Sequence, residues 1–226
     1  MTRFAAVLFD CDGVLVDSEP ITNGVLREML AEMGWSMSVQ ECSGHFVGHA
    51  VIDQAHLIQA NTGQQVTPQW LASFRARRDE ALLTRLEAVQ GIHACVDTVS
   101  AAMAGRIAVA SGADIGKVHL QLNKVGLISA FAGRSFSGME QARNKPHPDV
   151  YWAAAHALGV PIAQCAVIED SPNGASAGLA AGATVFGFVP KEESVASFYA
   201  GKSALQEVGV QHFFAHMNEL PALLGC

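Results

Sequence analysis

Hydrophobic and polar positions follow two different patterns along the chain. A short apolar run at residues 4–9 stops abruptly at polar residues and predicts a buried strand. From residue 18 to residue 87, apolar side chains recur at spacings of three and four, which is typical of amphipathic helices, and no strand pattern interrupts them. Helices are predicted over residues 21–33, 51–61 and 68–86, the first of them ending at Gly34.

From residue 89 onward, strand and helix patterns alternate. Strands are predicted over residues 106–111, 133–137, 165–169 and 183–189, and helices over residues 93–103, 115–125, 148–158 and 174–181. Repeated strand and helix in this order indicate a parallel sheet wrapped by helices. The predicted fold class is therefore α/β, a doubly wound, parallel, Rossmann-like sheet core with an all-helical cap inserted after the first strand. We assign residues 1–17 and 88–226 to the core and residues 18–87 to the cap.

Composition narrows the function classes. Half of the 226 residues are hydrophobic and 15% are charged, as expected for a chain with a large core rather than a disordered one. The net charge of −7 provides no broad basic surface, so neither nucleic acid nor an anionic membrane is an expected partner. No apolar stretch reaches the roughly 18 residues of a membrane span, and the N-terminus lacks the apolar region of a secretion signal.

The cysteines point to a reducing environment. Their number, five, is odd, and no Cys-x-x-Cys spacing occurs, which argues against a disulfide framework or a zinc site. We therefore expect a cytoplasmic protein. Its oligomeric state is not defined by the sequence, and a monomer is the expected state.

Two carboxylates follow the first predicted strand. Asp10 and Asp12 flank a single residue, and alternation along an extended chain would point both side chains the same way. Gly13 then allows the backbone to turn sharply. Ligands of open α/β sheets collect beyond the carboxyl ends of the strands. This arrangement suits a metal ion, or a nucleophile paired with an acid.

Other chemically suggestive residues occupy equivalent positions. Ser111 ends a strand and is followed by Gly112. The Ser111 hydroxyl and a free backbone N–H at this position suit the binding of an anion. Glu169 and Asp170 end another strand, and Lys145 lies shortly before a predicted helix. Taken singly, each has an ordinary explanation as a helix cap or a surface lysine. Together, at the carboxyl ends of several strands of one sheet, they indicate a single site.

These segments resemble the motifs of the haloacid dehalogenase-like hydrolases, in the phosphatase branch that carries a helical cap after the first strand. The resemblance covers nearly the whole chain. The matching segments are Asp10-Cys11-Asp12-Gly13-Val14-Leu15-Val16-Asp17-Ser18 for the first motif, Ser111 for the second, Lys145 within Lys-Pro-His-Pro-Asp for the third, and Ile168-Glu169-Asp170-Ser171 for the fourth. The chain departs from the family after Ser111, where Gly112 and Ala113 replace a residue that is often polar.

The resemblance implies an enzyme, a phosphoric monoester hydrolase. Asp10 would attack phosphorus and form an aspartyl-phosphate, and a carboxylate nucleophile divides one difficult displacement into two easier ones. Asp12 would act as an acid toward the leaving group and then as a base toward water. Ser111, Gly112 and Lys145 would bind and neutralise the transferring phosphoryl group.

The resemblance also implies a magnesium ion. Its expected ligands are Asp10, Asp170 and the backbone carbonyl of Asp12, with Glu169 acting directly or through water. Oxygen ligands without thiolate or imidazole favour Mg²⁺.

The cap would select the substrate, which we expect to be a small phosphorylated metabolite. The first motif and the cap are similar to those of bacterial phosphatases of sugar phosphates, 6-phosphogluconate among them, and phosphoglycolate is the next candidate. Gly48 and His49 are predicted in a substrate-facing cap loop. A metal-binding pair of His45 and His49 is less favoured, because Ser43, Gly44 and Gly48 indicate a loop rather than a helical turn. Arg75, Arg77 and Arg78 are typical of a solvated helix face, from which one could reach an anionic group.

A phosphosugar mutase is the alternative within the same family. β-Phosphoglucomutase carries a histidine where this chain has Thr22, and a phosphate-binding arginine where Val51 stands. A mutase must hold a second phosphate and keep water away from the acyl-phosphate, so the loss of both groups favours simple hydrolysis.

Two alternatives lie outside the family. A receiver-like, phosphate-accepting module would share the aspartate, the hydroxyl and the lysine, but would need neither Asp12 nor a cap. A serine esterase is suggested by Gly-x-Ser-x-Gly at residues 174–178, with Glu207 and His212 downstream. However, Ser176 does not follow its strand directly, as the nucleophile of such enzymes does.

Overall fold

A six-stranded parallel sheet forms the centre of the protein. The computed structural model describes residues 3–47, 50–190, 198–199 and 201–226. The strands are β1 (Ala6–Phe9), β2 (Ile107–Ser111), β3 (Ser135–Ser137), β4 (Cys165–Glu169), β5 (Thr184–Phe188) and β6 (His212–Phe214). Their order in the sheet is β3-β2-β1-β4-β5-β6, and every neighbouring pair is parallel. The predicted fold class is confirmed.

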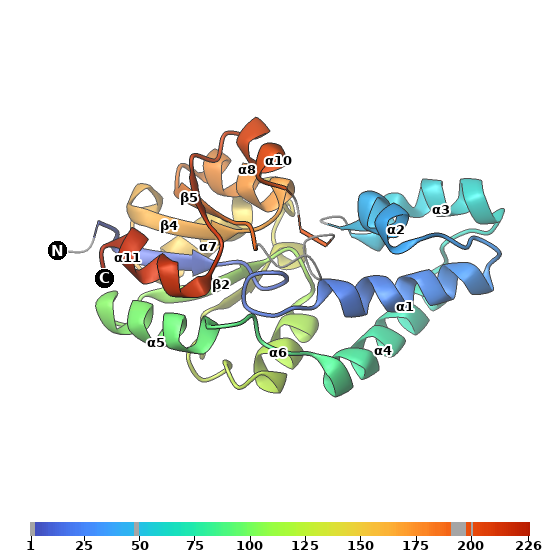
Figure 1. Ribbon diagram of the computed structural model, residues 1–226, viewed down its shortest axis with the longest axis horizontal. Helices are drawn as coiled ribbons and strands as arrows, with labels where there is room; N and C mark the ends of the chain where they lie inside the picture. Colours follow the sequence, from blue (N-terminus) through green and yellow to red (C-terminus); the bar gives the residue numbers. More distant parts are fainter. Residues whose placement is uncertain (1–2, 48–49, 191–197, 200) are drawn as a thin grey trace.

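Helices cover both faces of this sheet (Figure 1). One face carries α5 (Ile92–Ala102), α6 (Ile115–Lys124) and α11 (Leu220–Leu224), and the other carries α7 (Asp149–Ala157), α8 (Pro172–Ala181) and α10 (Lys202–Glu207). Side-chain alternation in β1 serves the two layers, because Val7 and Phe9 pack into the first and Ala6 and Leu8 into the second. Short 3₁₀ turns complete the core: η2 (Gly138–Glu140), η3 (Ile162–Gln164) and η4 (Met217–Glu219).

The register of the central strands positions the polar residues that follow them. Phe9 of β1 lies opposite Val109 of β2 and Ile168 of β4. Asp10, Ser111 and Glu169 therefore reach the same edge of the sheet. Strand order and register, rather than closeness in the sequence, create the site.

A group of helices lies between β1 and β2 in the sequence and projects from the sheet edge, at the right of Figure 1. They are α1 (Glu19–Glu32), α2 (Val39–Phe46), the 3₁₀ turn η1 (Val51–Gln54), α3 (Ala55–Thr62) and α4 (Pro68–Arg85). They have an apolar core of their own, which includes Leu30, Cys42, Ile58 and Phe74. At their base, the Asp17 N–H donates to the Glu87 carbonyl at 3.1 Å, so the entering and leaving segments are joined.

Helix α2 corrects one sequence-based interpretation. Ser43, Gly44 and His45 were expected in a loop but belong to this helix. Its start is fixed by a capping box, in which the Ser38 hydroxyl accepts from the Glu41 N–H at 3.2 Å and the Glu41 carboxylate accepts from the Ser38 N–H at 2.8 Å. Such a cap is worth about 1 kcal/mol, which offsets the similar cost of one glycine inside a helix. Gly48 and His49 lie outside the described residues.

Other elements also differ from expectation, and helices α10 and α11 were not predicted. The helix predicted over residues 51–61 is divided into η1 and α3. Strand β6 was not predicted, because it is only three residues long, lies at the sheet edge and pairs with β5 alone. No helix in the described part of the chain is both long and apolar enough to cross a membrane.

Candidate active site

The loop after β1 places two acids at the edge of the sheet. Asp10 follows the strand directly, and the Cys11 carbonyl accepts hydrogen bonds from the N–H groups of Leu15 and Val16, which closes a tight turn. Gly13 lies inside this turn with a φ of +78°. A Cβ atom at Gly13 would lie 2.2 Å from Asp170 Oδ2, so glycine is needed both for the backbone conformation and for space.

We therefore expect Gly13→Ala to disable the site. The added methyl group must displace the Asp170 carboxylate, and the positive φ is strained for any side chain. The phosphatase activity that the family resemblance implies should fall at least 100-fold, with a loss of about 1–3 kcal/mol in the free energy of unfolding. Gly126→Ala is the matched control, because Gly126 also has a positive φ but a Cβ atom there meets open space. Equal activity of the two variants would contradict the steric argument.

Lys145 joins two of the carboxylates. Its Nζ lies 2.6 Å from Asp10 Oδ1 and 2.6 Å from Glu169 Oε1. The Tyr151 hydroxyl donates to the same Glu169 oxygen at 2.6 Å, and Lys145 Nζ lies 5.0 Å from the centre of the Tyr151 ring. Burial opposes the charge of Lys145, but Asp10 and Glu169 outweigh it and raise the pKa of the lysine well above its usual range. Lys145 is thus held as a cation against Asp10.

The second oxygen of Glu169 is also occupied. Oε2 accepts from the Ser171 hydroxyl at 3.1 Å and from the backbone N–H groups of Asp170 and Ser171. A Cβ atom at Gly174 would lie 1.7 Å from Glu169 Oε1, so this glycine makes room for the carboxylate. Fully buried and bonded through both oxygens, Glu169 is a rigid member of the site.

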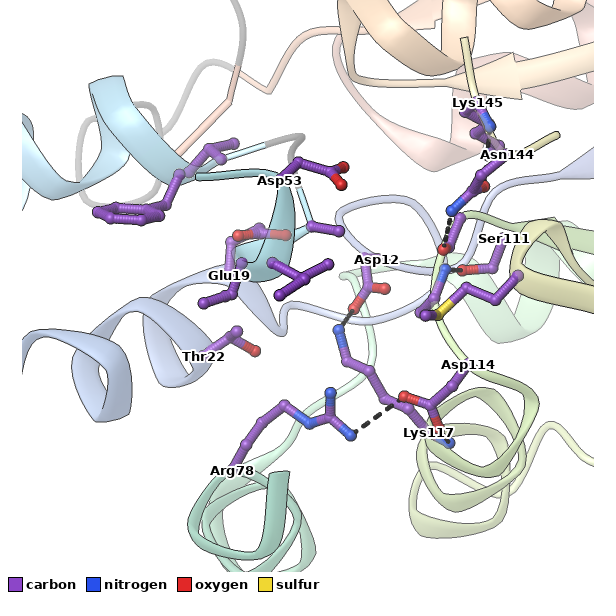
Figure 2. A pocket seen from close by; sticks show the side chains of 18 of the residues that line it. Asp12, Glu19, Thr22, Asp53, Arg78, Ser111, Asp114, Lys117, Asn144 and Lys145 are labelled. Atoms are coloured by element: carbon purple, nitrogen blue, oxygen red, sulfur yellow. Dashed lines mark hydrogen bonds and ion pairs between the residues drawn. The ribbon is translucent and has the colours of Figure 1, made fainter. Parts of the chain in front are cut away.

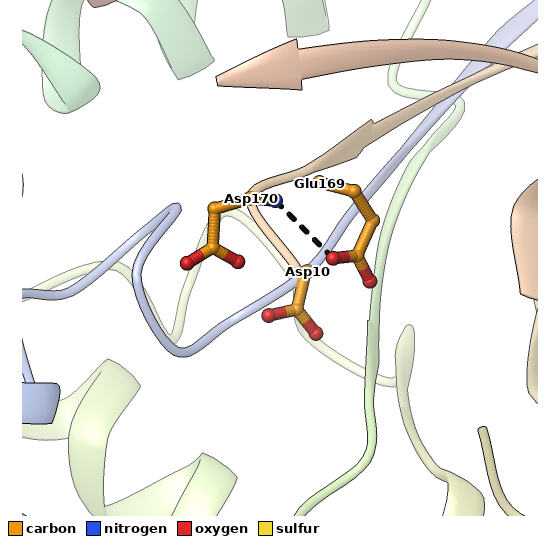
Figure 3. A group of neighbouring side chains, drawn as sticks. All are labelled: Asp10, Glu169 and Asp170. Carbon is orange, nitrogen blue, oxygen red and sulfur yellow. Dashed lines mark hydrogen bonds between the residues drawn. The ribbon is translucent and has the colours of Figure 1, made fainter. Parts of the chain in front are cut away.

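Asp10, Glu169 and Asp170 form a cluster of carboxylates (Figure 3). One oxygen from each lies within 4.8 Å of the others. Burial raises the pKa of Asp10 to about 7, against the opposing charge of Lys145. Burial also raises the pKa of Asp170 well above its usual range, and the charges of Glu169 and Asp10 add to the effect. Three acids facing one lysine leave an excess of negative charge, and a hard divalent cation would fit this donor set.

Asp12 has a different environment. Its Oδ1 accepts from Lys117 Nζ at 2.7 Å, from Gln121 Nε2 at 2.7 Å and from the Ser18 hydroxyl. Burial would raise the pKa of Asp12, but Lys117 and these hydrogen bonds outweigh it and hold the value at about 2. The pKa values of the two aspartates of the first motif are therefore shifted in opposite directions although one residue separates them.

A hydroxyl and an amide organise the next strand end. Ser111 Oγ accepts from the Ala113 N–H at 3.1 Å. Asn144 Nδ2 donates to the Gly112 carbonyl at 2.9 Å, and its Oδ1 accepts from the Lys145 N–H at 2.8 Å. Asn144 thus ties the segment that carries Ser111 to the segment that carries Lys145.

A cavity of about 220 Å³ lies above these residues (Figure 2). Asp10, Asp12, Ser111, Lys145 and Asp170 line it from the sheet edge. The helices between β1 and β2 contribute further lining residues. The apolar ones include Phe46, Val51 and Phe74, and the polar ones include Glu19, Thr22 and Arg78. Burial and the Asp12 charge raise the pKa of Glu19 to about 7.

The three arginines of α4 have different environments. Arg77 is exposed and pairs with Glu32 at 2.6 Å, as expected of a solvated face. Arg75 is exposed and lines the cavity. Arg78 is buried, and its guanidinium lies 2.7 Å from Asp79 and 3.4 Å from Asp114 at the start of α6. The solvated-face interpretation is therefore wrong for Arg78.

The predicted site residues Asp10, Asp12, Ser111, Lys145 and Asp170 come together around the cavity, and Glu169 and Gly112 adjoin them. Sequence reasoning missed residues that support them: Ser18, Lys117, Gln121, Asn144 and Tyr151. One signal was available for Lys117 and Gln121. These polar residues stand one helical turn apart among the buried positions of α6, where an ordinary helix would carry apolar residues. Ser176 lies inside α8 rather than at a strand-to-helix turn, so the esterase interpretation has no structural support.

Comparison with known proteins agrees with the family resemblance seen in the sequence motifs. A family model described as haloacid dehalogenase-like hydrolase matches residues 4–182. The 6-phosphogluconate phosphatase of Escherichia coli (strain K12) is 29% identical over 99% of this chain and 96% of its own length. The fructose-1-phosphate phosphatase of the same organism is 28% identical over 80% of this chain and 94% of its own length. A crystal structure of a hydrolase of this family from Deinococcus radiodurans R1, with bound phosphate and sodium, is 32% identical, covers 100% of this chain and 96% of its own, and has a TM-score of 0.79.

The chain therefore belongs to the haloacid dehalogenase-like hydrolase family. Within that family it is an enzyme of the phosphoric monoester hydrolase class.

Proposed function

We propose that this protein is a Mg²⁺-dependent phosphatase of small phosphorylated sugars or sugar acids that works through an aspartyl-phosphate. One observation carries the proposal: a buried carboxylate, Asp10, lies between a lysine and a second acidic residue at the floor of a cavity. Residues 1–17 and 88–226 form its catalytic core in this proposal, and residues 18–87 form its cap. The separate apolar core of the inserted helices supports this division. We also propose that the enzyme acts as a cytoplasmic monomer.

Asp10 is the nucleophile of the proposed reaction. Its carboxylate attacks phosphorus as the bond from phosphorus to the leaving oxygen breaks. Lys145, whose Nζ lies 2.6 Å from Asp10 Oδ1, neutralises charge on the incoming phosphoryl oxygens. Ser111 and Gly112 line the same cavity, and in this proposal they bind the phosphoryl group through a hydroxyl and a backbone N–H. Positioning and charge neutralisation supply most of the catalysis in such transfers.

Mg²⁺ would be held by Asp10, Asp170 and the backbone carbonyl of Asp12. No hydrogen bond to the Asp170 carboxylate is found among the described residues, whereas both oxygens of Glu169 are occupied by Lys145, Tyr151 and Ser171. Glu169 is therefore proposed to act through water and by orienting Lys145. Bound Mg²⁺ would neutralise phosphoryl charge and favour the ionised form of Asp10, whose pKa is otherwise near 7.

The cavity supports a sugar phosphate rather than a large substrate. At about 220 Å³ it has room for a small ligand, and it combines apolar side chains with polar ones. Two curated relatives are phosphatases named for 6-phosphogluconate and fructose 1-phosphate. Thr22 and Val51, the positions at which a mutase would carry a histidine and an arginine, both line the cavity. Neither side chain can hold a second phosphate by charge, which favours hydrolysis.

A substrate panel tests this proposal. Free phosphate should be released in the presence of Mg²⁺ from 6-phosphogluconate or fructose 1-phosphate at least tenfold faster, by kcat/KM, than from phosphoglycolate. A parallel assay follows the conversion of β-glucose 1-phosphate to glucose 6-phosphate with a bisphosphate primer. Efficient isomerisation with negligible phosphate release would overturn the phosphatase assignment, and a preference for phosphoglycolate would overturn the substrate class.

A further inference from the structure

The carboxylate of Asp12 is held through one oxygen only. Lys117 Nζ, Gln121 Nε2 and the Ser18 hydroxyl all donate to Oδ1, and no hydrogen bond to Oδ2 is found among the residues that the structure describes. Figure 2 shows the Lys117 side chain rising from α6 to this oxygen. A carboxylate with three donors on one oxygen cannot rotate without breaking them, so its free oxygen has a fixed direction.

Helix α6 makes this arrangement rigid. Lys117 and Gln121 lie one turn apart on its buried face, beside Val118 and Leu122, which pack into the core. The helix start is fixed by Asp114, whose Oδ1 accepts from the Lys117 N–H at 2.9 Å. Gln121 is held at its other end as well, because the Cys11 thiol donates to its Oε1 at 3.4 Å.

We propose that Lys117 and Gln121 are positioning residues that hold Asp12 through Oδ1, so that Oδ2 is the oxygen that exchanges the proton during catalysis. This inference rests on the proposed phosphatase function. It assigns a role to the buried polar face of α6, which otherwise has no structural reason to be polar. Ser18 is the third contact and lies at the start of α1, six residues after Asp12.

The proton balance of the two steps is simple. In the first, the negative charge of the bound phosphate opposes the low pKa of Asp12, so that Oδ2 takes up a proton from solvent. Asp10 then forms a bond to phosphorus, the bond to the leaving oxygen breaks, and that oxygen receives the proton from Oδ2. In the second, a water oxygen attacks phosphorus, its proton passes to Oδ2, and the bond to Asp10 breaks with release of inorganic phosphate. An alkoxide leaving group needs the first proton, whereas p-nitrophenolate leaves without one.

The two leaving groups differ in their need for a proton, and this difference provides the test. In Lys117→Met, kcat/KM for 6-phosphogluconate, or for the panel sugar phosphate that the wild type prefers, should fall about 100-fold, the cost of a misplaced acid. For p-nitrophenyl phosphate, kcat/KM should change less than about threefold, because this ratio reports only the steps through release of the phenolate. Gln121→Met should show the same split with a smaller loss. Lys124→Met, an exposed lysine at the end of α6, is the matched control and should leave both ratios unchanged.

A second readout follows the base step. With p-nitrophenyl phosphate, Lys117→Met should show a burst of phenolate close to one equivalent per enzyme and a lowered kcat, because hydrolysis of the aspartyl-phosphate becomes limiting. An equal loss of kcat/KM for both substrates in Lys117→Met and Gln121→Met would overturn the positioning role. Failure of the proposed function itself is distinguishable, since the wild type would then hydrolyse neither substrate.

Discussion

Asp10→Asn is expected to lower phosphatase activity by at least 10⁴-fold while the protein stays folded. The amide is nearly isosteric with the carboxylate but cannot form the acyl-phosphate, and residues that act as a unit in catalysis lose several orders of magnitude when one is removed. The fold should tolerate the change, because burial already disfavours the charge and raises the pKa of Asp10 to about 7. Activity is measured as phosphate release, and folding as the thermal unfolding midpoint.

Asp97→Asn is the matched control for this variant. Asp97 is exposed on α5, away from the cavity, so its amide should retain full activity. Rapid acid quenching of the wild type with radiolabelled substrate should leave phosphate bound to the protein, and the Asp10→Asn variant should carry none. Turnover by Asp10→Asn within tenfold of the wild type would exclude the covalent mechanism.

The sheet edge could be predicted from the sequence because its information is local. Each of Asp10, Ser111 and Glu169 follows or ends a short apolar run, and parallel strands bring such positions to one edge. The strand-helix alternation then required only the standard right-handed connections. Their proximity followed from these rules, and their catalytic roles remain predictions.

The supporting residues could not be predicted because their information is not local. Lys117 and Gln121 reach a carboxylate 105 and 109 residues earlier in the chain. Helical periodicity indicates which face of α6 is buried, but not that a partner acid lies opposite it. The role of Tyr151 could not be predicted either. Its sequence context is that of an ordinary buried aromatic residue of α7, and only the structure shows that its hydroxyl donates a hydrogen bond to Glu169.

The helices α1 to α4 were the least predictable region. Glycine at position 44 indicated a loop, but in the structure the capping box of Ser38 and Glu41 starts a helix that includes this glycine. Arg78 has the sequence context of a surface residue, yet it is buried, where it pairs with its neighbour Asp79 and with Asp114 from a distant part of the chain. Burial of a charged residue depends on such a partner, which periodicity alone does not reveal.

Removal of divalent metal is expected to abolish activity. Burial raises the pKa of Asp10 and of Asp170, and the charge of Glu169 adds to both shifts. Among the described residues, Lys145 is the basic side chain that pairs with this cluster, which leaves an excess of negative charge. EDTA should reduce phosphate release to background, and Mg²⁺ should restore it. Ca²⁺ should support it poorly, because its larger and looser coordination disturbs the in-line geometry of phosphoryl transfer. Full activity after exhaustive chelation would refute the metal assignment.

Binding of the ion can be measured without activity. Mg²⁺ at about 100 times its Kd should stabilise the wild type by about 2.7 kcal/mol, which corresponds to a rise of roughly 5–10 °C in the Tm of a protein of this size. Asp170→Asn removes one proposed ligand and also relieves repulsion with Glu169 and Asp10. Its Tm without metal should therefore equal or exceed that of the wild type, while its response to Mg²⁺ disappears. Asp97→Asn should keep the full response, and an unchanged response in Asp170→Asn would place the ion elsewhere.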